Sequence, residues 1–131
     1  MVSVIVPAYN AEDTIKKCLE AVLKQSIPKK DYEVIVVDDG STDQTANIIK
    51  KFSTVKYFYQ ENQGPAKARN KGAKEAKGEI ILFTDSDCEA DTYWIEEMIK
   101  PFTDPKIIGV KGSYKTKQTR LIARFAQIEF E

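Results

Sequence analysis

The sequence predicts an α/β fold with a mostly parallel sheet and helices on both faces. Two observations predict this class. Segments typical of strands and of helices alternate along the chain, in the order expected for parallel strands joined by crossover helices. Most of the strand segments are apolar without interruption, as strands buried on both faces are. The 131 residues suffice for one domain with a hydrophobic core.

The first strand and helix are distinguished by the period of their apolar residues. Residues 2–6 form an apolar run that Pro7 ends, and residues 12–25 carry apolar side chains at helical spacing. We expect Asn10 to cap that helix, because its side chain can accept a backbone N–H at the helix start. The second strand, 33–37, is again continuously apolar at its centre.

The middle of the chain repeats this alternation. A helix is expected at 43–52, capped by Ser41 or Thr42, and a short strand at 55–59. The next helix is expected at 65–76, and the proline that opens it suits a first helical turn.

The last part of the chain begins with the buried strand 80–83 and a helix at 92–102. A fifth strand is expected at 107–114, more polar than the others. Residues 119–131 read as an amphipathic helix whose apolar face needs a partner.

Composition excludes several classes of function. Lys+Arg and Asp+Glu both number 20, so bulk electrostatics do not indicate nucleic-acid binding. No apolar stretch approaches the length of a membrane span. Without histidine, a general base would be a carboxylate or, less readily, Lys, Tyr or Cys. Cys18 and Cys88 follow no metal-ligand spacing, and we interpret both as free thiols in a reducing compartment.

Two carboxylates one residue apart, Asp85 and Asp87, follow the strand at 80–83. They are expected where that strand emerges, at the edge where open α/β sheets bind ligands. Hard oxygen ligands suit Mg²⁺ or Mn²⁺ and, through the ion, a phosphate. Helix capping by Asp87 or Asp91 is the competing interpretation, but it leaves Asp85 and Glu89 unexplained.

Polar residues follow three of the expected strands, at 7–10, 38–41 and 84–87. Taken singly, residues 38–41 are equally well explained as a turn with a helix cap, and Tyr9 as a partly buried surface aromatic residue. In a parallel sheet, however, the three groups share one edge, so their side chains converge. A nucleotide suits such an edge: Tyr9 can stack on a base, and Asp39 can accept an N–H from a pyrimidine-like edge.

Three basic residues, Lys67, Arg69 and Lys71, lie near the start of the helix at 65–76. Arg69 can form paired hydrogen bonds to a phosphate or a carboxylate. For the two lysines, a solvated helix face is the preferred interpretation.

Four sequence segments occur together in one order and spacing. They are residues 2–10 (VSVIVPAYN), 33–43 (EVIVVDDGSTD), 62–72 (NQGPAKARNKG) and 78–87 (GEIILFTDSD). In these segments the chain resembles the amino-terminal, nucleotide-sugar-binding part of family 2 glycosyltransferases, which have the GT-A fold. The resemblance implies inverting transfer of a sugar from a nucleotide diphosphate sugar, with a UDP-sugar favoured. The acceptor would be a saccharide, a lipid or a protein.

By position, the resemblance also implies roles for individual residues. The donor-binding set would be Pro7, Tyr9, Asp39, Arg69, Asp85 and Ser86. Asp39 would recognise the base and Tyr9 would flank it, with Arg69 near the sugar-phosphate. Asp85 and Asp87 would form the family's Asp-x-Asp motif: Asp87 ligates Mn²⁺ or Mg²⁺, and Asp85 contacts ribose or metal-bound water.

The catalytic base of the family, usually a carboxylate after the fifth strand, has no match between Gly109 and Glu131. We therefore expect a nucleotide-sugar-binding domain at 1–115 and, at 116–131, a terminal helix that begins a truncated acceptor-side region. That helix offers a contact for homo-oligomers. The expected location is the cytoplasm, with membrane association of the full-length protein as an alternative.

Three other readings of the acidic motif stay open. In haloacid dehalogenase-like phosphatases, a strand also precedes Asp-x-Asp, but on the first strand of the fold and with a different residue at the place of Glu89. A nucleotide-binding module without catalysis would equally lack a base. A response-regulator-like domain uses paired acids as well, but finds no support in Tyr9 or in the segment 62–72.

Overall fold

A computed structural model of the chain describes residues 1–107 and residue 109. The expected terminal helix at 119–131, the domain boundary at 115 and most of the expected strand at 107–114 lie outside the described residues.

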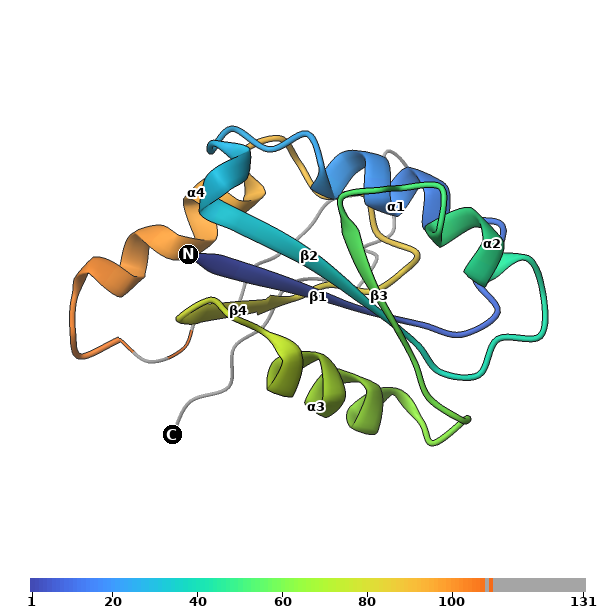
Figure 1. Cartoon of the computed structure of the whole chain (residues 1–131). Coiled ribbons are helices and arrows are strands. Elements are labelled where there is room, and N and C mark those ends of the chain that lie inside the picture. The colour runs from blue at the N-terminus through green and yellow to red at the C-terminus, as the bar shows by residue number, and fades with distance from the viewer. Residues whose placement is uncertain (108, 110–131) are drawn as a thin grey trace, which may run out of the picture.

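Within the described residues, one sheet forms the centre of the fold (Figure 1). Its four strands are β1 (Val2–Ala8), β2 (Tyr32–Asp38), β3 (Val55–Tyr59) and β4 (Ile80–Phe83). Their order is β3-β2-β1-β4, and all three pairings are parallel. The parallel sheet expected from the alternating segments is confirmed, and β3 and β4 have the expected bounds.

Helices cover both faces of this sheet, as expected (Figure 1). They are α1 (Ile15–Val22), α2 (Thr45–Ile49), α3 (Pro65–Glu75), α4 (Trp94–Ile99) and the short 3₁₀ turns η1 (Lys29–Asp31) and η2 (Lys100–Thr103). Helices α1, α2 and α4 lie on one face, and α3 lies alone on the other (Figure 1). The two faces have separate hydrophobic clusters, because successive side chains of each strand point to opposite sides.

The α3 face depends on a close approach between a helix and the central strand. Ala68 and Gly72 of α3 are buried against the sheet. A Cβ placed on Gly72 would lie 2.4 Å from Ile5 Cγ2 and 3.3 Å from Val37 Cγ2. Glycine is therefore required there by space, with no demand on its backbone angles.

Strand β1 runs two residues further than expected and includes Pro7. Pro7 is aligned with Val37 of β2, while β4 already ends at Phe83, opposite Ile5. Since Ile5 O accepts a hydrogen bond from the β4 side, from Thr84 N at 3.1 Å, Pro7 faces that same side beyond the end of β4. Its missing N–H therefore removes no bond from the sheet.

Both expected helix caps in the first half of the chain were wrong. The N-cap of α1 is Thr14, and the helix begins at Ile15, well after Asn10. The N-cap of α2 is Gln44, so neither Ser41 nor Thr42 holds that place. The reason is that the polar side chains after β1 and β2 bond across to the neighbouring loop instead of to the next helix.

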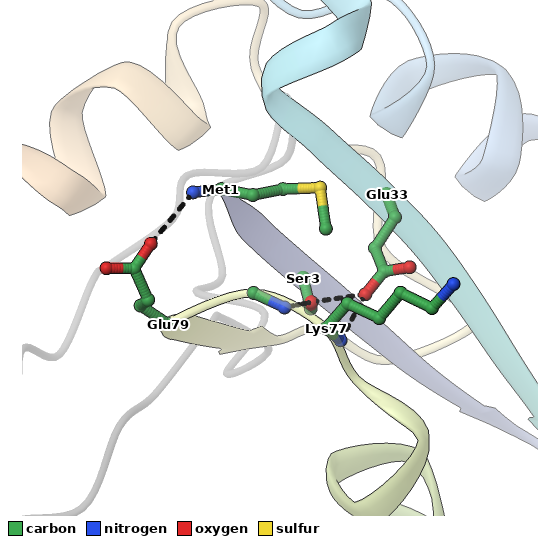
Figure 2. A network of polar contacts seen from close by, with 6 residues as sticks. Met1, Ser3, Glu33, Lys77 and Glu79 are labelled. Atoms are coloured by element: carbon green, nitrogen blue, oxygen red, sulfur yellow. Dashed lines mark hydrogen bonds and ion pairs between the residues drawn. The ribbon is translucent and has the colours of Figure 1, made fainter.

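The amino ends of the strands carry a partly buried polar network (Figure 2). Ser3 Oγ donates to Glu33 Oε2 at 2.6 Å, and Lys77 N donates to the same oxygen at 2.7 Å. Lys56 Nζ pairs with Glu33 Oε1, and Gly78 N donates to Ser3 Oγ at 2.8 Å. Burial alone would raise the pKa of Glu33, but the hydrogen bonds from Lys56, Ser3 and Lys77 outweigh it and lower that pKa.

The start of the chain closes the same edge. The amino group of Met1 lies 3.3 Å from Glu79 Oε1 (Figure 2), and Glu79 N donates to Met1 O at 3.0 Å. A Cβ on Gly78 would lie 2.7 Å from both Met1 O and Ser3 N.

Among the described residues, none of the helices has the length and apolar character needed to cross a bilayer.

Candidate functional site

The carboxyl ends of β1, β2 and β4 lie together at one edge of the sheet, as the sequence predicted. Ala8 is aligned with Asp38, and Asp39 N donates to Ala8 O at 2.8 Å. Thr84 N, just after β4, donates to Ile5 O of β1. The polar groups that follow these three strands therefore face a common region.

The acidic loop after β4 gathers three potential ligand atoms. One oxygen each from Asp85 and Asp87 and the Cys88 sulfur lie within 4.8 Å of one another. Asp85 is partly buried, and Asp87 is exposed. Two hard oxygen donors this close, at the open edge of a sheet, fit Mg²⁺ or Mn²⁺.

Cys88 directly follows Asp87 in the sequence, and its sulfur is a soft ligand that suits Mg²⁺ poorly. Its Sγ lies 3.7 Å from Asp87 Oδ1. Burial, reinforced by the neighbouring charges of Asp87 and Asp85, raises the pKa of Cys88 to about 12. Cys88 is therefore a neutral thiol at pH 7, which leaves the two carboxylates as the hard oxygen ligands that the cluster offers. Both cysteines are free, as expected, and Cys18 is fully buried in the core.

Arg69 contacts this cluster from helix α3, which covers one face of the sheet by itself (Figure 1). Its Nη2 lies 3.4 Å from Asp85 Oδ1. A guanidinium has five N–H donors, and this ion pair uses one of them. Both side chains are partly exposed, at 40% for Arg69 and 31% for Asp85, so the pair is accessible from solvent. Of the neighbouring lysines, Lys67 is exposed, and Lys71 lies over the ring of Phe58 at 5.8 Å.

The first of the two neighbouring acids, Asp38, is the last residue of β2 and is fully buried. Its Oδ1 accepts from Ser41 N at 2.9 Å, and its Oδ2 accepts from the Tyr57 hydroxyl at 2.6 Å. Burial and this bond raise the pKa of Tyr57. Asp38 thus holds the turn after β2 against β3, which is a structural role.

The second acid, Asp39, is only 4% exposed and accepts hydrogen bonds from the loop after β3. The donors are Gln60 Nε2 and Gln63 N at 2.8 Å, Gly64 N at 3.0 Å and Asn62 Nδ2 at 3.3 Å. Burial alone would raise the pKa of Asp39, but the hydrogen bonds from Gln60, Gln63 and Gly64 outweigh it and lower that pKa. With two donors on each oxygen, Asp39 is saturated by its own chain.

The loop after β1 bonds to the loop after β2. Asn10 N donates to Ser41 Oγ at 2.9 Å, and Thr42 N donates to Asn10 Oδ1 at 2.8 Å. Sequence reasoning missed this link. Both loops follow adjacent parallel strands, and that adjacency was the available signal.

The remaining predicted residues differ in accessibility. Tyr9 is 50% exposed at the carboxyl edge, while Pro7 is buried within β1. Ser86 lies between the two acids and is partly buried. The edge therefore brings Tyr9, Arg69 and the acidic loop to the surface, but leaves Pro7 inside the sheet.

The chain matches the sequence model of glycosyl transferase family 2 over residues 3–126. It is 40% identical over 117 residues to glycosyltransferase AglE of Haloferax volcanii, covering 86% of this chain and 38% of that protein. It is 45% identical over 124 residues to poly(ribitol-phosphate) beta-glucosyltransferase of Bacillus spizizenii, covering 85% of this chain and 20% of that protein.

Solved structures agree in fold. TarS 1–349 of S. aureus in complex with UDP-GlcNAc has a TM-score of 0.83 at 36% identity, over 92% of this chain and 36% of that one. The mannosyltransferase PcManGT of Pyrobaculum calidifontis, in complex with GDP-Man and Mn²⁺, has a TM-score of 0.82 at 30% identity, over 88% of this chain and 35% of that one. The chain thus spans well under half the length of these relatives. It belongs to glycosyl transferase family 2 and has the GT-A fold.

Proposed function

We propose that this chain is the donor-binding part of an inverting glycosyltransferase that uses a nucleotide diphosphate sugar. The observation that carries the proposal is the cluster of Asp85, Asp87 and Arg69 at the carboxyl edge of the sheet. Related proteins were solved with UDP-GlcNAc and with GDP-Man and Mn²⁺. We favour a UDP-sugar as donor and a saccharide, lipid or protein as acceptor.

The diphosphate would lie over the acidic loop. Asp87, the exposed acid, would ligate Mn²⁺ or Mg²⁺ directly, and Asp85 would contact ribose or metal-bound water. When bound, the ion would neutralise the charge that develops on the leaving diphosphate. Arg69 would add a cationic donor beside the same phosphates. Ser86 belongs to this loop and would contact the donor from its backbone or hydroxyl.

The nucleobase of the donor would lie between Tyr9 and Asp39. Tyr9 offers a half-exposed ring for stacking. For Asp39 to accept an N–H from the base, one of its present donors must move away, because its two oxygens are saturated. The amides of Gln60 and Asn62 are side-chain donors, so either can turn away without moving the backbone. Pro7 would shape this end of β1 from within the sheet.

Transfer itself would need residues outside the described part of the chain. In the sequence, no carboxylate between Gly109 and Glu131 matches the catalytic base that family members usually have after the fifth strand. We therefore propose a donor-binding domain at 1–115 and the beginning of an acceptor-side region at 116–131. The isolated chain would bind nucleotide and metal but transfer sugar poorly. The free thiols favour a reducing compartment such as the cytoplasm.

Calorimetric titration with UDP- and GDP-sugars, with and without Mn²⁺, tests the proposal. We expect binding that depends on the metal and is tightest for a UDP-sugar. Absence of binding for every nucleotide sugar in the presence of Mn²⁺ would contradict it.

A binding module without catalysis is the second candidate, because no carboxylate between Gly109 and Glu131 matches the family's catalytic base. Acceptor-dependent turnover by a longer chain would separate the two. Family membership argues against the phosphatase and response-regulator readings.

A further inference from the structure

Asn10 has an unusual backbone conformation beside the proposed base site. Its φ of 46° makes it the one non-glycine residue with positive φ among residues 1–107 and 109. Asparagine tolerates this left-handed region better than most residues, whereas alanine does not. Such conformations are retained where surrounding contacts determine them, and they cluster at ligand sites.

The surrounding contacts come from the loop after β2. The Asn10 backbone N–H donates to Ser41 Oγ, and the Asn10 side-chain oxygen accepts from Thr42 N. Both the backbone and the side chain of Asn10 are therefore bonded to the loop after β2. Both bonds are exposed, and exposed hydrogen bonds contribute little to global stability. Their main consequence is to fix the path of the chain at this point.

Two neighbouring positions extend the link between the loops. Ala11 N donates to Thr45 Oγ1 at 2.7 Å. Gln44 N donates to Glu12 Oε1 at 3.0 Å. Each loop thus both donates to and accepts from the other. The two loops are therefore joined to each other and to the turn that carries Asp39.

We propose that Asn10 is a positioning residue that holds the ring of Tyr9 in place for stacking on the nucleobase. Tyr9 directly precedes Asn10, and its own strand end is bonded to Asp39 through Ala8 O. The backbone of Tyr9 thus lies between the end of β1 and the left-handed turn at Asn10, and these two fix the position from which the exposed ring extends. The inference rests on the proposed function, because it requires a base at this site.

Two substitutions separate the backbone from the side chain. Asn10→Gly keeps access to positive φ but loses the acceptor for Thr42 N, and we expect UDP affinity to fall about threefold. Asn10→Ala loses the acceptor for Thr42 N and also the ready access to positive φ. We expect UDP affinity to fall about tenfold in this variant, because the loop would spend most of its time out of the binding geometry. Affinity for inorganic pyrophosphate with Mn²⁺, which has no base, should not change in either variant.

A double-mutant cycle tests whether Asn10 acts through Tyr9. In a Tyr9→Ala chain, adding Asn10→Ala should cost no further UDP affinity, because there is no ring left to position. Asn47→Ala is the matched control, since it removes an exposed asparagine from α2 that bonds only to Gln44 among the described residues. It should bind UDP like the unaltered chain.

The outcomes distinguish the two proposals. Unchanged UDP affinity in both Asn10 variants, equal losses for UDP and pyrophosphate, or additive losses in the cycle would overturn the role of Asn10 alone. If the unaltered chain binds no nucleotide with Mn²⁺, the proposed function fails, and this inference fails with it. Thermal unfolding of Asn10→Gly, expected to match the unaltered chain closely, checks that the fold is intact.

Discussion

The two edges of the sheet use their acidic residues in opposite ways. At the amino edge, Glu33 is bonded to Ser3 and Lys77 (Figure 2) and also to Lys56. At the carboxyl edge, Asp87 is exposed in the loop after β4. A buried acid with internal partners supports the fold, and an exposed acid beside another carboxylate is available to a ligand.

Asp39 shows that the edge alone does not decide the role. It lies at the carboxyl edge, yet it is almost fully buried and has four donors from its own chain. In bonding it resembles Glu33 more than Asp87. The comparison therefore predicts separate effects on ligand binding and on stability for these three acids.

The largest expected effect is on ligand binding by Asp87→Ala. Loss of the proposed metal ligand should weaken UDP binding in the presence of Mn²⁺ by at least about 100-fold, or about 2.7 kcal/mol. The free energy of unfolding should change by less than about 0.5 kcal/mol, because Asp87 is exposed. Titration calorimetry and urea unfolding measure the two quantities.

Glu89→Ala is the matched control for this change. Glu89 is another exposed acid of the same loop, outside the group of potential ligand atoms. Its substitution should leave metal-dependent binding within about twofold. Equal losses in the two variants would mean that general negative charge, and not a metal ligand at Asp87, attracts the ligand.

The opposite pattern is expected for Glu33→Ala at the amino edge. Three donors would lose a charged acceptor, which should lower the free energy of unfolding by about 2 kcal/mol. Nucleotide affinity of the folded protein should stay unchanged, because the two edges lie at opposite ends of the strands. Urea unfolding measures the first quantity. A variant of full stability that has lost UDP binding would break the comparison.

The sheet could be predicted from sequence because its strands form short apolar runs, and the two central strands, β1 and β2, are buried along nearly their whole length. Strands 55–59 and 80–83 have the expected bounds. The helix caps could not be predicted in this way. Asn10 and Thr42 are residue types that commonly cap helices. Because β1 and β2 are adjacent strands, however, the loops that follow them meet, and Thr42 N donates to Asn10 Oδ1 across them.

The site was predicted less completely than the sheet. Side-chain chemistry and strand ends sufficed to place Asp85 and Asp87 together at one edge. The saturation of Asp39 was not visible, because its donors come from the loop at 60–64, which is distant in sequence.

Asp39→Asn should lower both the stability and the UDP affinity. Asp39 is hydrogen-bonded within the chain as Glu33 is, and it lies at the carboxyl edge of the sheet as Asp87 does. The amide group would place N–H donors against donors of the loop after β3, which should lower the free energy of unfolding by about 1 to 2 kcal/mol. UDP affinity should also fall, whereas pyrophosphate affinity should not. Loss of stability without loss of UDP affinity would give Asp39 a purely structural role.

The smallest expected effect is the response of stability to acid. The pKa of Glu33 and that of Asp39 are each lowered, because hydrogen bonds to the charged carboxylates outweigh the opposing effect of burial. In the same way, hydrogen bonds from Thr45 and Glu12 N outweigh burial and lower the pKa of Asp43. For such groups the unfolded chain takes up protons first, so the free energy of unfolding rises with pH in this range.

Stability should therefore be constant above the ordinary carboxyl range, about pH 5, and decline as the pH falls through the lowered pKa values. Urea unfolding between pH 7 and pH 3 measures this slope. Glu33→Gln removes one of the three titrating groups, so its unfolding free energy should be lower at pH 7 and should decline less steeply than that of the unaltered chain. An equal slope in the two proteins would mean that Glu33 is not stabilised as a carboxylate, and the contrast between the two edges would lose its electrostatic basis.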